Sequence, residues 1–232
     1  MLSILTSGYE ARLVFLMAIA YVIAILGAII LHELAHGLVA YWNGDLTAKM
    51  RGRLSLNPLK HLDPIGSLML LVVGFGWAKP VPIDSRQFRH FRKGMITTAL
   101  AGVATNLILA LISFGGFAIV NAVAGPQTLT QGAYYAVRFF QYLFLYGATI
   151  NLTLMAFNLI PIYPLDGFRI VETLAKPNNR YVEFNYRYGN FLLLGLLVAS
   201  TLLGYITPYL NIFSLYINGV IRLFGMIFHV GF

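Results

Sequence analysis

The chain has 232 residues, of which 59% are hydrophobic and only 10% carry a charge, and its mean hydropathy is +0.76. Soluble domains contain about 25% charged residues, so this composition argues against a soluble globular protein and indicates an integral membrane protein. The chain has no cysteine, which excludes disulfides, thiolate metal sites and a cysteine nucleophile.

The first predicted element is an uncharged run from Leu13 to Leu31. Its length of about 19 residues matches the roughly 20 that a helix needs to cross the hydrocarbon layer. The run is too long for the apolar core of a signal peptide, and no basic region precedes it. Tyr41 and Trp42 suit the membrane interface, and Asn43-Gly44 predicts the end of the helix.

The next apolar stretch, Gly66–Ala78, holds three glycines and is too short to span a membrane. It predicts a re-entrant or interfacial hairpin, followed by the basic, proline-containing loop 79–93. Two roles are open for this hairpin. Its backbone edges could contact an unwound substrate helix, or the stretch could be a short interfacial anchor held by Trp77.

Four longer apolar stretches follow, with polar connectors at 126–137 and 168–187. The stretches are Gly94–Gly125, Phe139–Ile160, Gly189–Ile206 and Tyr209–Phe228. The chain is therefore expected to be an all-α integral membrane protein with about five transmembrane helices plus one short re-entrant or interfacial hairpin. Residues 1–232 are expected to form a single polytopic domain, without a second soluble domain.

The net charge of +8 lies mostly in three predicted loops, 45–65, 79–93 and 168–187. One topology puts all three loops on the same side, and basic loops favour the cytoplasm. We therefore expect a multi-pass plasma-membrane protein with its N-terminus outside and its C-terminus inside. Orientation explains the charge, so no nucleic-acid partner is expected.

The stretch "HELAH" (32–36) places three ionisable groups at the inner end of the first predicted span. His32 and His36 share one helix face, and Glu33 projects about 100° away. In zinc hydrolases of the H-E-x-x-H type, the histidines bind the metal and the glutamate is the general base. A structural His–Glu network or an interfacial cluster is the alternative. Ionisable groups inside a membrane are costly, which favours a functional site near the cytoplasmic face.

A catalytic zinc site normally has a third protein ligand. Val39 and Trp42 stand where an extended H-E-x-x-H-x-x-G-x-x-H motif needs glycine and histidine. Asp166 is the leading candidate, because it follows a span in "NLIPIYPLDGFR", whose prolines break the helix and whose Gly167 allows a turn. Asp63 is the second. The other acids and histidines considered are Asp45, Asp84, Glu172, Glu183, His61, His90 and His229.

"HELAH" together with "NLIPIYPLDG" (158–167) resembles the site-2 protease family of intramembrane zinc metalloproteases. "AGVATN" (101–106) is similar to the family's glycine-plus-asparagine element, and "GWAKPVPI" (76–83) to a compact bacterial subgroup. The resemblance implies that His32, His36 and Asp166 bind one Zn²⁺ and that Glu33 is the catalytic base. It also implies that Asn106 contacts substrate or stabilises the oxyanion. From the residues alone, a helix–helix hydrogen bond by Asn106 is equally open.

The expected function is therefore a zinc-dependent endopeptidase that hydrolyses peptide bonds in transmembrane or signal-peptide-derived segments near the cytoplasmic face. We expect no room for the PDZ or CBS domains of many family members, so gating by such modules is either absent or supplied by a regulatory partner or a homo-oligomer. The alternative is a non-proteolytic metal-binding transporter or scaffold, which predicts ionisable residues along several spans. A membrane hydrolase with a non-peptide substrate would share the same site.

Overall fold

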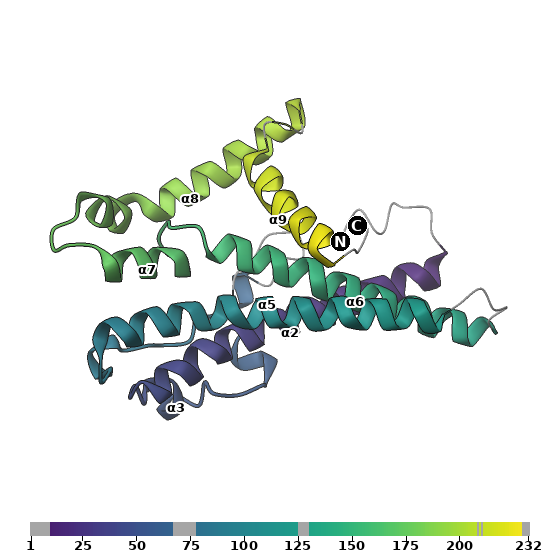
Figure 1. Cartoon of the computed structure of the whole chain (residues 1–232), viewed down its shortest axis with the longest axis horizontal. Coiled ribbons are helices and arrows are strands. Elements are labelled where there is room, and N and C mark those ends of the chain that lie inside the picture. Colours follow the sequence, from purple (N-terminus) through teal and green to yellow (C-terminus); the bar gives the residue numbers. More distant parts are fainter. Residues whose placement is uncertain (1–9, 67–77, 125–129, 208, 210, 229–232) are drawn as a thin grey trace.

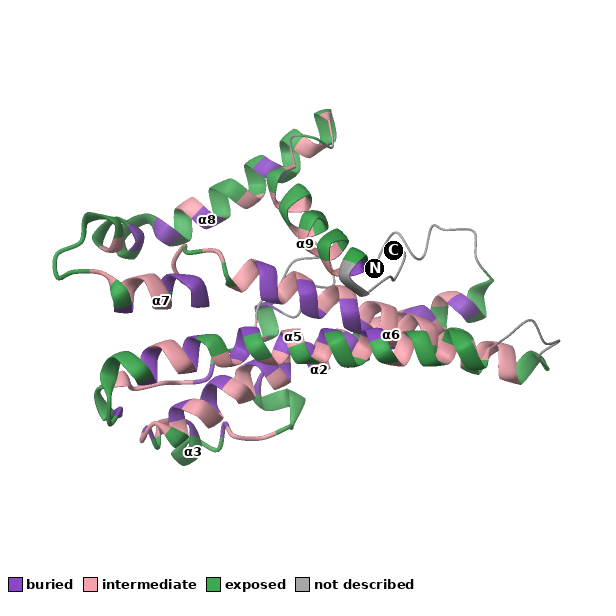
Figure 2. Cartoon of the chain, in the orientation of Figure 1, coloured by how far each residue is buried: buried purple, intermediate pink, exposed green. Residues whose placement is uncertain are grey.

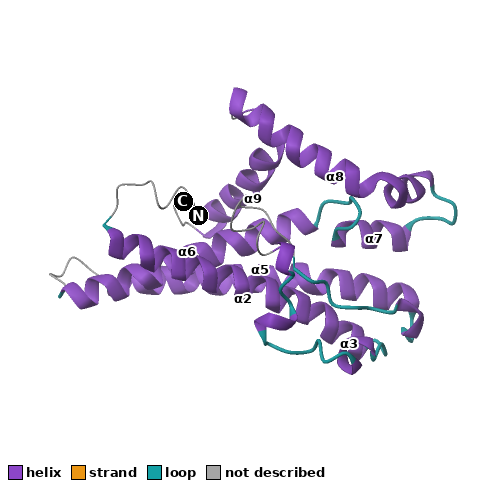
Figure 3. Cartoon of the chain, turned by 180° about the vertical axis from the view of Figure 1, so that it is seen from behind, coloured by secondary structure: helices purple, strands orange, loops and turns teal. Residues whose placement is uncertain are grey.

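The computed structural model describes residues 10–66, 78–124, 130–207, 209 and 211–228 (Figure 1). Its helices are α2 (Ala11–Trp42), α3 (Thr47–Met50), α5 (Phe91–Val123), α6 (Gln131–Asn158), α7 (Asp166–Leu174), α8 (Arg180–Ile206) and α9 (Ile212–Phe228). Two short 3₁₀ turns, η1 (Pro58–Lys60) and η2 (Ser85–Gln87), lie in the connections, which are drawn as loops in Figure 3. The described ranges contain no β-strand, only an isolated bridge between Leu62 and Ala78.

Four of these helices, α2, α5, α6 and α8, are long and apolar enough to cross a membrane. The prediction of an all-α membrane protein is therefore confirmed. The expected count of about five spans is not, because α9 has 17 residues and a length of roughly 25 Å. All but the two end residues of the predicted hairpin Gly66–Ala78 lie outside the described residues.

Two predicted connectors are wrong in extent. Residues 131–137 are helical in α6, and residues 168–187 include most of α7 and the beginning of α8. Side chains explain where these helices begin. Thr130 caps α6 by accepting from the Ala133 N–H, and Asn179 caps α8 by accepting from Tyr181 and Val182. A hydropathy pattern finds only the apolar middle of a helix whose polar ends continue beyond it.

The helices α2, α5 and α6 pack together along their lengths, and their buried residues face inward (Figure 2). Small side chains line this packing: Ala20 and Ala28 of α2, Ala110 of α5 and Ala148 of α6 are at most 1% exposed. Small residues let helices approach closely where lipid supplies no hydrophobic driving force between them. The bundle therefore fixes α2 against α5.

In contrast, α8 diverges from the bundle and is largely exposed along its length (Figures 1 and 2). The N-terminal turns of α8 nevertheless form hydrogen bonds with the segment that follows α6. Fully buried Asn185 accepts a hydrogen bond from the Tyr163 N–H at 3.2 Å, and Tyr181 donates to the Pro161 carbonyl. The irregular segment 159–165 is thus held from α8.

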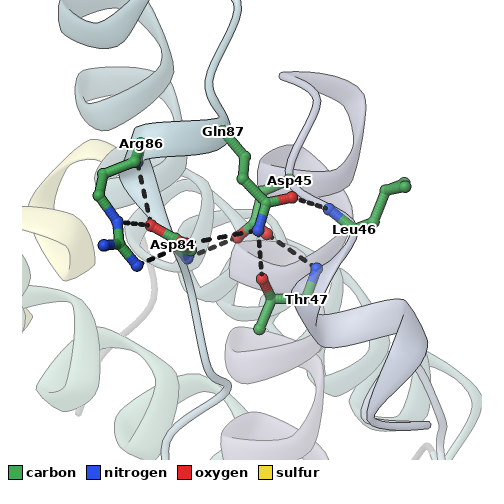
Figure 4. A network of polar contacts seen from close by, with 6 residues as sticks. All are labelled: Asp45, Leu46, Thr47, Asp84, Arg86 and Gln87. Carbon is green, nitrogen blue, oxygen red and sulfur yellow. Dashed lines mark hydrogen bonds and ion pairs between the residues drawn. The ribbon is translucent and has the colours of Figure 1, made fainter.

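A polar network fastens segment 78–90 to the end of α2 (Figure 4). Asp45 is fully buried, and its two oxygens accept from the backbone N–H groups of Thr47 and Asp84, each at 2.8 Å. Gln87 adds a 3.1 Å bond to the Thr47 hydroxyl. The carboxylate of Asp45 therefore joins two segments that are far apart in the sequence.

The same network has an exposed outer pair, Asp84 and Arg86, joined at 2.8 Å. The Arg86 guanidinium lowers the pKa of Asp84 to about 2. A lowered pKa stabilises the folded state above the ordinary Asp pKa, and this contribution is lost as the pH falls towards 2. Because water screens an exposed pair, its effect on stability is small.

We predict that Asp45→Ala destabilises the protein and that Arg86→Ala has little effect. The first change leaves two backbone donors without their acceptor, which costs roughly 1–3 kcal/mol for each donor that water does not reach. The measurement is the apparent Tm of the purified protein in detergent. Equal losses in the two variants would show that the buried carboxylate has no special role.

Candidate active site

Three side chains converge between the C-terminal part of α2 and the start of α7. The Nε2 atoms of His32 and His36 are 3.0 Å apart, and they lie 3.3 and 3.1 Å from Oδ2 of Asp166. All three residues are buried. The ligand atoms of the three residues lie close enough together to hold one metal ion, and no other such group of histidines and acids occurs among the described residues.

Asp166 reaches the histidines because α6 ends early. The helix stops at Asn158, Pro161 and Pro164 follow in an irregular segment, and Asp166 is the first residue of α7. The prediction that Gly167 forms a turn is wrong, since it is helical. Glycine is needed there for close approach, because a Cβ atom would overlap the Leu159 carbonyl.

Each histidine uses its Nδ1 atom for a bond to α5. His36 Nδ1 lies 2.7 Å from the Thr98 carbonyl, and His32 Nδ1 lies 2.5 Å from Oδ1 of Asn106. A carbonyl oxygen only accepts, so Nδ1 of His36 carries the proton. Its Nε2 lone pair then faces the other two groups, as in metal-binding histidines whose second nitrogen is held by an acceptor.

This arrangement fits a zinc ion. Oδ2 of Asp166 is buried without a hydrogen-bond partner, and it faces two ring nitrogens. Tetrahedral zinc with bonds of about 2.0–2.1 Å separates its ligand atoms by roughly 3.3 Å, close to the observed spacings. Gly102 of α5 keeps the space open, since a Cβ there would lie 2.5 Å from Nε2 of His36 and 2.7 Å from Nε2 of His32.

The carboxylate state of Asp166 also suits a metal ligand. Its Oδ2 lies 3.3 and 3.1 Å from the Nε2 atoms of His32 and His36. A carboxylate oxygen and two ring nitrogens thus converge on one point. A buried charge of this kind requires a partner of opposite sign.

Glu33 lies in the same cavity but outside the group of three. One of its oxygens, Oε2, accepts from the Val81 N–H at 2.8 Å. The cavity has a volume of about 130 Å³, and the wall beside Glu33 is the extended segment 79–83. The cavity is lined by His32, Glu33, His36, Pro80, Val81, Ile83, Met95, Thr98, Ala99, Asn158, Pro164, Asp166 and Arg169.

The other candidate ligands lie in separate contacts. Asp63, the second choice from sequence, accepts from the Gly66 N–H at 2.8 Å at the end of its loop. His61 is buried and bonds through Nε2 to the Ser55 carbonyl, while Glu172 accepts from the Tyr186 hydroxyl. His229 lies outside the described residues.

Asn106 lies behind His32 and is fully buried. Its Oδ1 faces His32, and its Nδ2 donates to Asn151 of α6 at 2.7 Å. Both ends of the amide are therefore engaged across helices, and the side chain is fully buried. Sequence reasoning missed Asn151, although an amide within an apolar span is itself a signal of interhelical bonding.

Sequence reasoning also missed two backbone groups of the site, the Thr98 carbonyl and the Val81 N–H. Any residue offers the same main-chain atoms, so no residue type marks such contacts. Only the packing of α5 and of segment 78–90 against α2 brings them to His36 and Glu33.

A bundle of apolar helices that encloses two imidazoles, a carboxylate and a separate glutamate defines the class of membrane zinc metalloproteases. Comparisons with known proteins assign the chain to the same class. Residues 89–196, which include Asn106 and Asp166 but begin after α2, match the model of Peptidase family M50. The chain belongs to this family of site-2 proteases, and it is a zinc metalloprotease.

The relatives extend over most of the chain. "Putative zinc metalloprotease YwhC" of Bacillus subtilis (strain 168) is 39% identical over 208 residues, which are 89% of this chain and 91% of that protein. "Putative zinc metalloprotease Rip2" of Mycolicibacterium smegmatis is 31% identical over 186 residues, 78% of this chain and 64% of that protein. Rip2 of Mycobacterium tuberculosis (strain H37Rv) is 30% identical over 199 residues, 83% and 70% of the two chains. No solved structure is significantly similar.

We predict that Gly102→Ala lowers zinc binding, because its methyl group would displace both imidazoles. Overpacking of this kind typically costs 1–3 kcal/mol. The measurement is the zinc content per chain of the purified protein, by elemental analysis.

Gly115→Ala is the matched control on the same helix, because a Cβ atom there meets no atom within 4 Å. It should bind zinc as the wild type does. Equal zinc content in both variants would contradict the close approach of α5 to the histidines.

Proposed function

We propose that the chain is an intramembrane endopeptidase that hydrolyses peptide bonds in transmembrane or signal-peptide-derived segments near the cytoplasmic face. The observation that carries this proposal is the convergence of His32, His36 and Asp166 within 3.3 Å of one another at the inner part of an apolar helix, with Glu33 in the same cavity. Residues 1–232 act as one polytopic domain.

In this proposal His32, His36 and Asp166 hold one Zn²⁺. Zinc bound there would polarise the scissile carbonyl and lower the pKa of a bound water. The two imidazoles serve as ligands through Nε2, since the Nδ1 atoms of both face acceptors on α5. The ligand set is thus pre-oriented by the helix bundle before any substrate enters.

Glu33 is the general base. The Val81 N–H holds Oε2 and leaves Oε1 to accept a proton from the attacking water. The same carboxyl then donates that proton to the leaving amine, which completes hydrolysis with the proton balance conserved. Exclusion of bulk water from the cavity would strengthen each of these interactions.

Asn106 has two possible contributions. Family resemblance assigns it to substrate or to the oxyanion, and this role stays a prediction. The hydrogen bonds observed for Asn106 favour an action through His32 instead, since both polar ends of its side chain are occupied within the bundle.

The proposed orientation has the site towards the cytoplasm and the N-terminus outside. It is supported by the positive charge of segments 45–65, 79–93 and 168–187, which lie at one end of the bundle (Figure 1). Basic segments favour the cytoplasmic side of a plasma membrane. A cytoplasmic C-terminus follows if α9 returns across the bilayer.

The proposed substrate is a membrane-protein segment or peptide that is locally unwound. Helical carbonyls are hydrogen-bonded and covered, and the cavity of about 130 Å³ accommodates an extended chain better than a helix. The extended segment 79–83 forms one wall of this cavity, so it is the surface that such a chain would meet. A regulatory partner or a second copy of the chain would control access.

We predict that Glu33→Gln abolishes cleavage but keeps zinc. Glutamine retains an oxygen that accepts from the Val81 N–H, yet it cannot take up the proton, so the rate should fall about a hundred- to ten-thousand-fold. The measurement uses proteoliposomes, a set of synthetic single-span peptides and ¹⁸O-labelled water. Hydrolysis is read by mass spectrometry as ¹⁸O in a new C-terminal carboxylate.

Glu183→Gln, at an exposed position of α8, is the control and should cleave as the wild type does. Undiminished cleavage by Glu33→Gln would refute the role of this residue. Zinc flux across the liposomes without cleavage of any peptide would favour the transporter alternative.

We further predict that a zinc chelator stops cleavage and that added Zn²⁺ restores it. The three proposed ligands are the means by which the protein retains the ion, so the apoprotein should remain folded but inactive. Circular dichroism measures the fold, and the ¹⁸O assay measures hydrolysis. Full activity in the chelated protein would overturn the metal-dependent mechanism.

A further inference from the structure

A chain of buried amides crosses the bundle behind the metal-binding face of His32. Asn106 of α5 lies 2.5 Å from His32 Nδ1, and its Nδ2 donates to Asn151 Oδ1 at 2.7 Å. Asn151 of α6 in turn donates to the Gly147 carbonyl at 2.8 Å. Asn106 is fully buried and Asn151 is 3% exposed, so the bonds link three helices out of contact with water.

The far end of this chain fixes the direction of every bond in it. The Gly147 carbonyl can only accept, so the Asn151 NH₂ group must face it, and the Asn151 oxygen must face Asn106. The Asn106 NH₂ group therefore points to Asn151, and its oxygen points to His32. Reversing either amide would bring two oxygens or two NH₂ groups together.

His32 must consequently carry its proton on Nδ1. Its Nε2 then has a free lone pair, which is directed at the space shared with His36 and Asp166. The tautomer and the ring orientation that zinc requires are thus determined by a residue, Asn151, that does not touch the ligand group.

The two histidines differ in how they are held. His36 Nδ1 bonds to the main-chain carbonyl of Thr98, an acceptor that side-chain substitution does not remove. His32 depends on a side chain, which itself depends on a second side chain on another helix. The site is therefore expected to be more sensitive to substitution behind His32 than behind His36.

We propose that Asn151 is a positioning residue of the zinc site, acting through Asn106 on His32. This inference rests on the proposed function, since it presumes that His32 binds zinc. Loss of a group behind a metal-binding histidine typically lowers metal affinity 10–100-fold. The same bonds tie α2, α5 and α6 at one level, so assembly of the bundle and alignment of the ligand occur together.

The test compares three substitutions at this position. Asn151→Ser removes the acceptor for Asn106, while its hydroxyl can bond back to the Gly147 carbonyl and leave the helix satisfied. Asn151→Leu removes both polar groups at similar size. Asn151→Asp is the conservative variant, because its protonated carboxyl keeps an oxygen towards Asn106 and directs an O–H donor to the Gly147 carbonyl. Thr149→Val on α6 is the control, because that hydroxyl bonds to the Leu145 carbonyl of its own helix at 2.9 Å.

The readout is zinc affinity of the full-length protein in detergent, measured by competition with a chromophoric chelator. Visible absorption of the Co²⁺-substituted protein reports the ligand geometry. We expect Asn151→Ser and Asn151→Leu to bind zinc 10–100-fold more weakly with altered Co²⁺ spectra. Asn151→Asp should bind more tightly than either, and Thr149→Val as the wild type does. Thermal unfolding of the metal-free variants separates this effect from loss of the fold.

Wild-type zinc affinity and an unchanged Co²⁺ spectrum in Asn151→Ser would overturn the proposal, even if Asn151→Leu does not fold. Equal weakening in Thr149→Val would overturn it too, since the effect would then belong to the helix and not to the amide chain. A wild-type protein that binds zinc but cleaves no peptide refutes the proposed function and leaves the zinc test of Asn151 intact. A wild-type protein that binds no zinc refutes both.

Discussion

Polar groups enclosed by apolar helices have no water to bond with, and this constraint shapes the whole site. Each chemically important side chain is therefore held by another segment of the protein. His32 and His36 bond to α5, Glu33 bonds to segment 78–90, and Asp166 faces the two histidines. For the two histidines and Glu33 these hydrogen bonds replace water and also fix the direction of each side chain.

The helix α5 has the central role in this arrangement. Within about two turns, α5 contributes three features to the site. The Thr98 carbonyl orients His36, and the amide of Asn106 orients His32. Gly102, which has no side chain, leaves space for an ion between them. The proposed zinc site thus depends on the packed pair α2–α5, to which α7 adds a carboxylate.

Segment 78–90 connects the proposed base to the stability of the fold. Its Val81 N–H holds Glu33, and its Asp84 N–H is bonded to the buried carboxylate of Asp45. The segment also contributes a wall of the cavity. Two backbone hydrogen bonds thus hold this wall of the cavity in place beside Glu33.

The amino-acid sequence by itself determined the membrane class, the end of the first span at Trp42 and the interruption after Asn158. These features depend on local properties: length of an apolar run, a capping asparagine and two prolines. It also marked His32, Glu33 and His36, because an i, i+4 pair needs only one helix, and Asp166, because it follows a helix that prolines terminate.

The tertiary structure alone decided how these residues are held. The contact of Asn151 with Asn106 joins positions 45 residues apart, and the bond from Val81 to Glu33 joins positions 48 apart. Nor could hydropathy find the polar beginning of α6 or the helical state of Gly167. Such features arise when distant segments pack and must satisfy one another's polar groups, and no local pattern records which partners will meet.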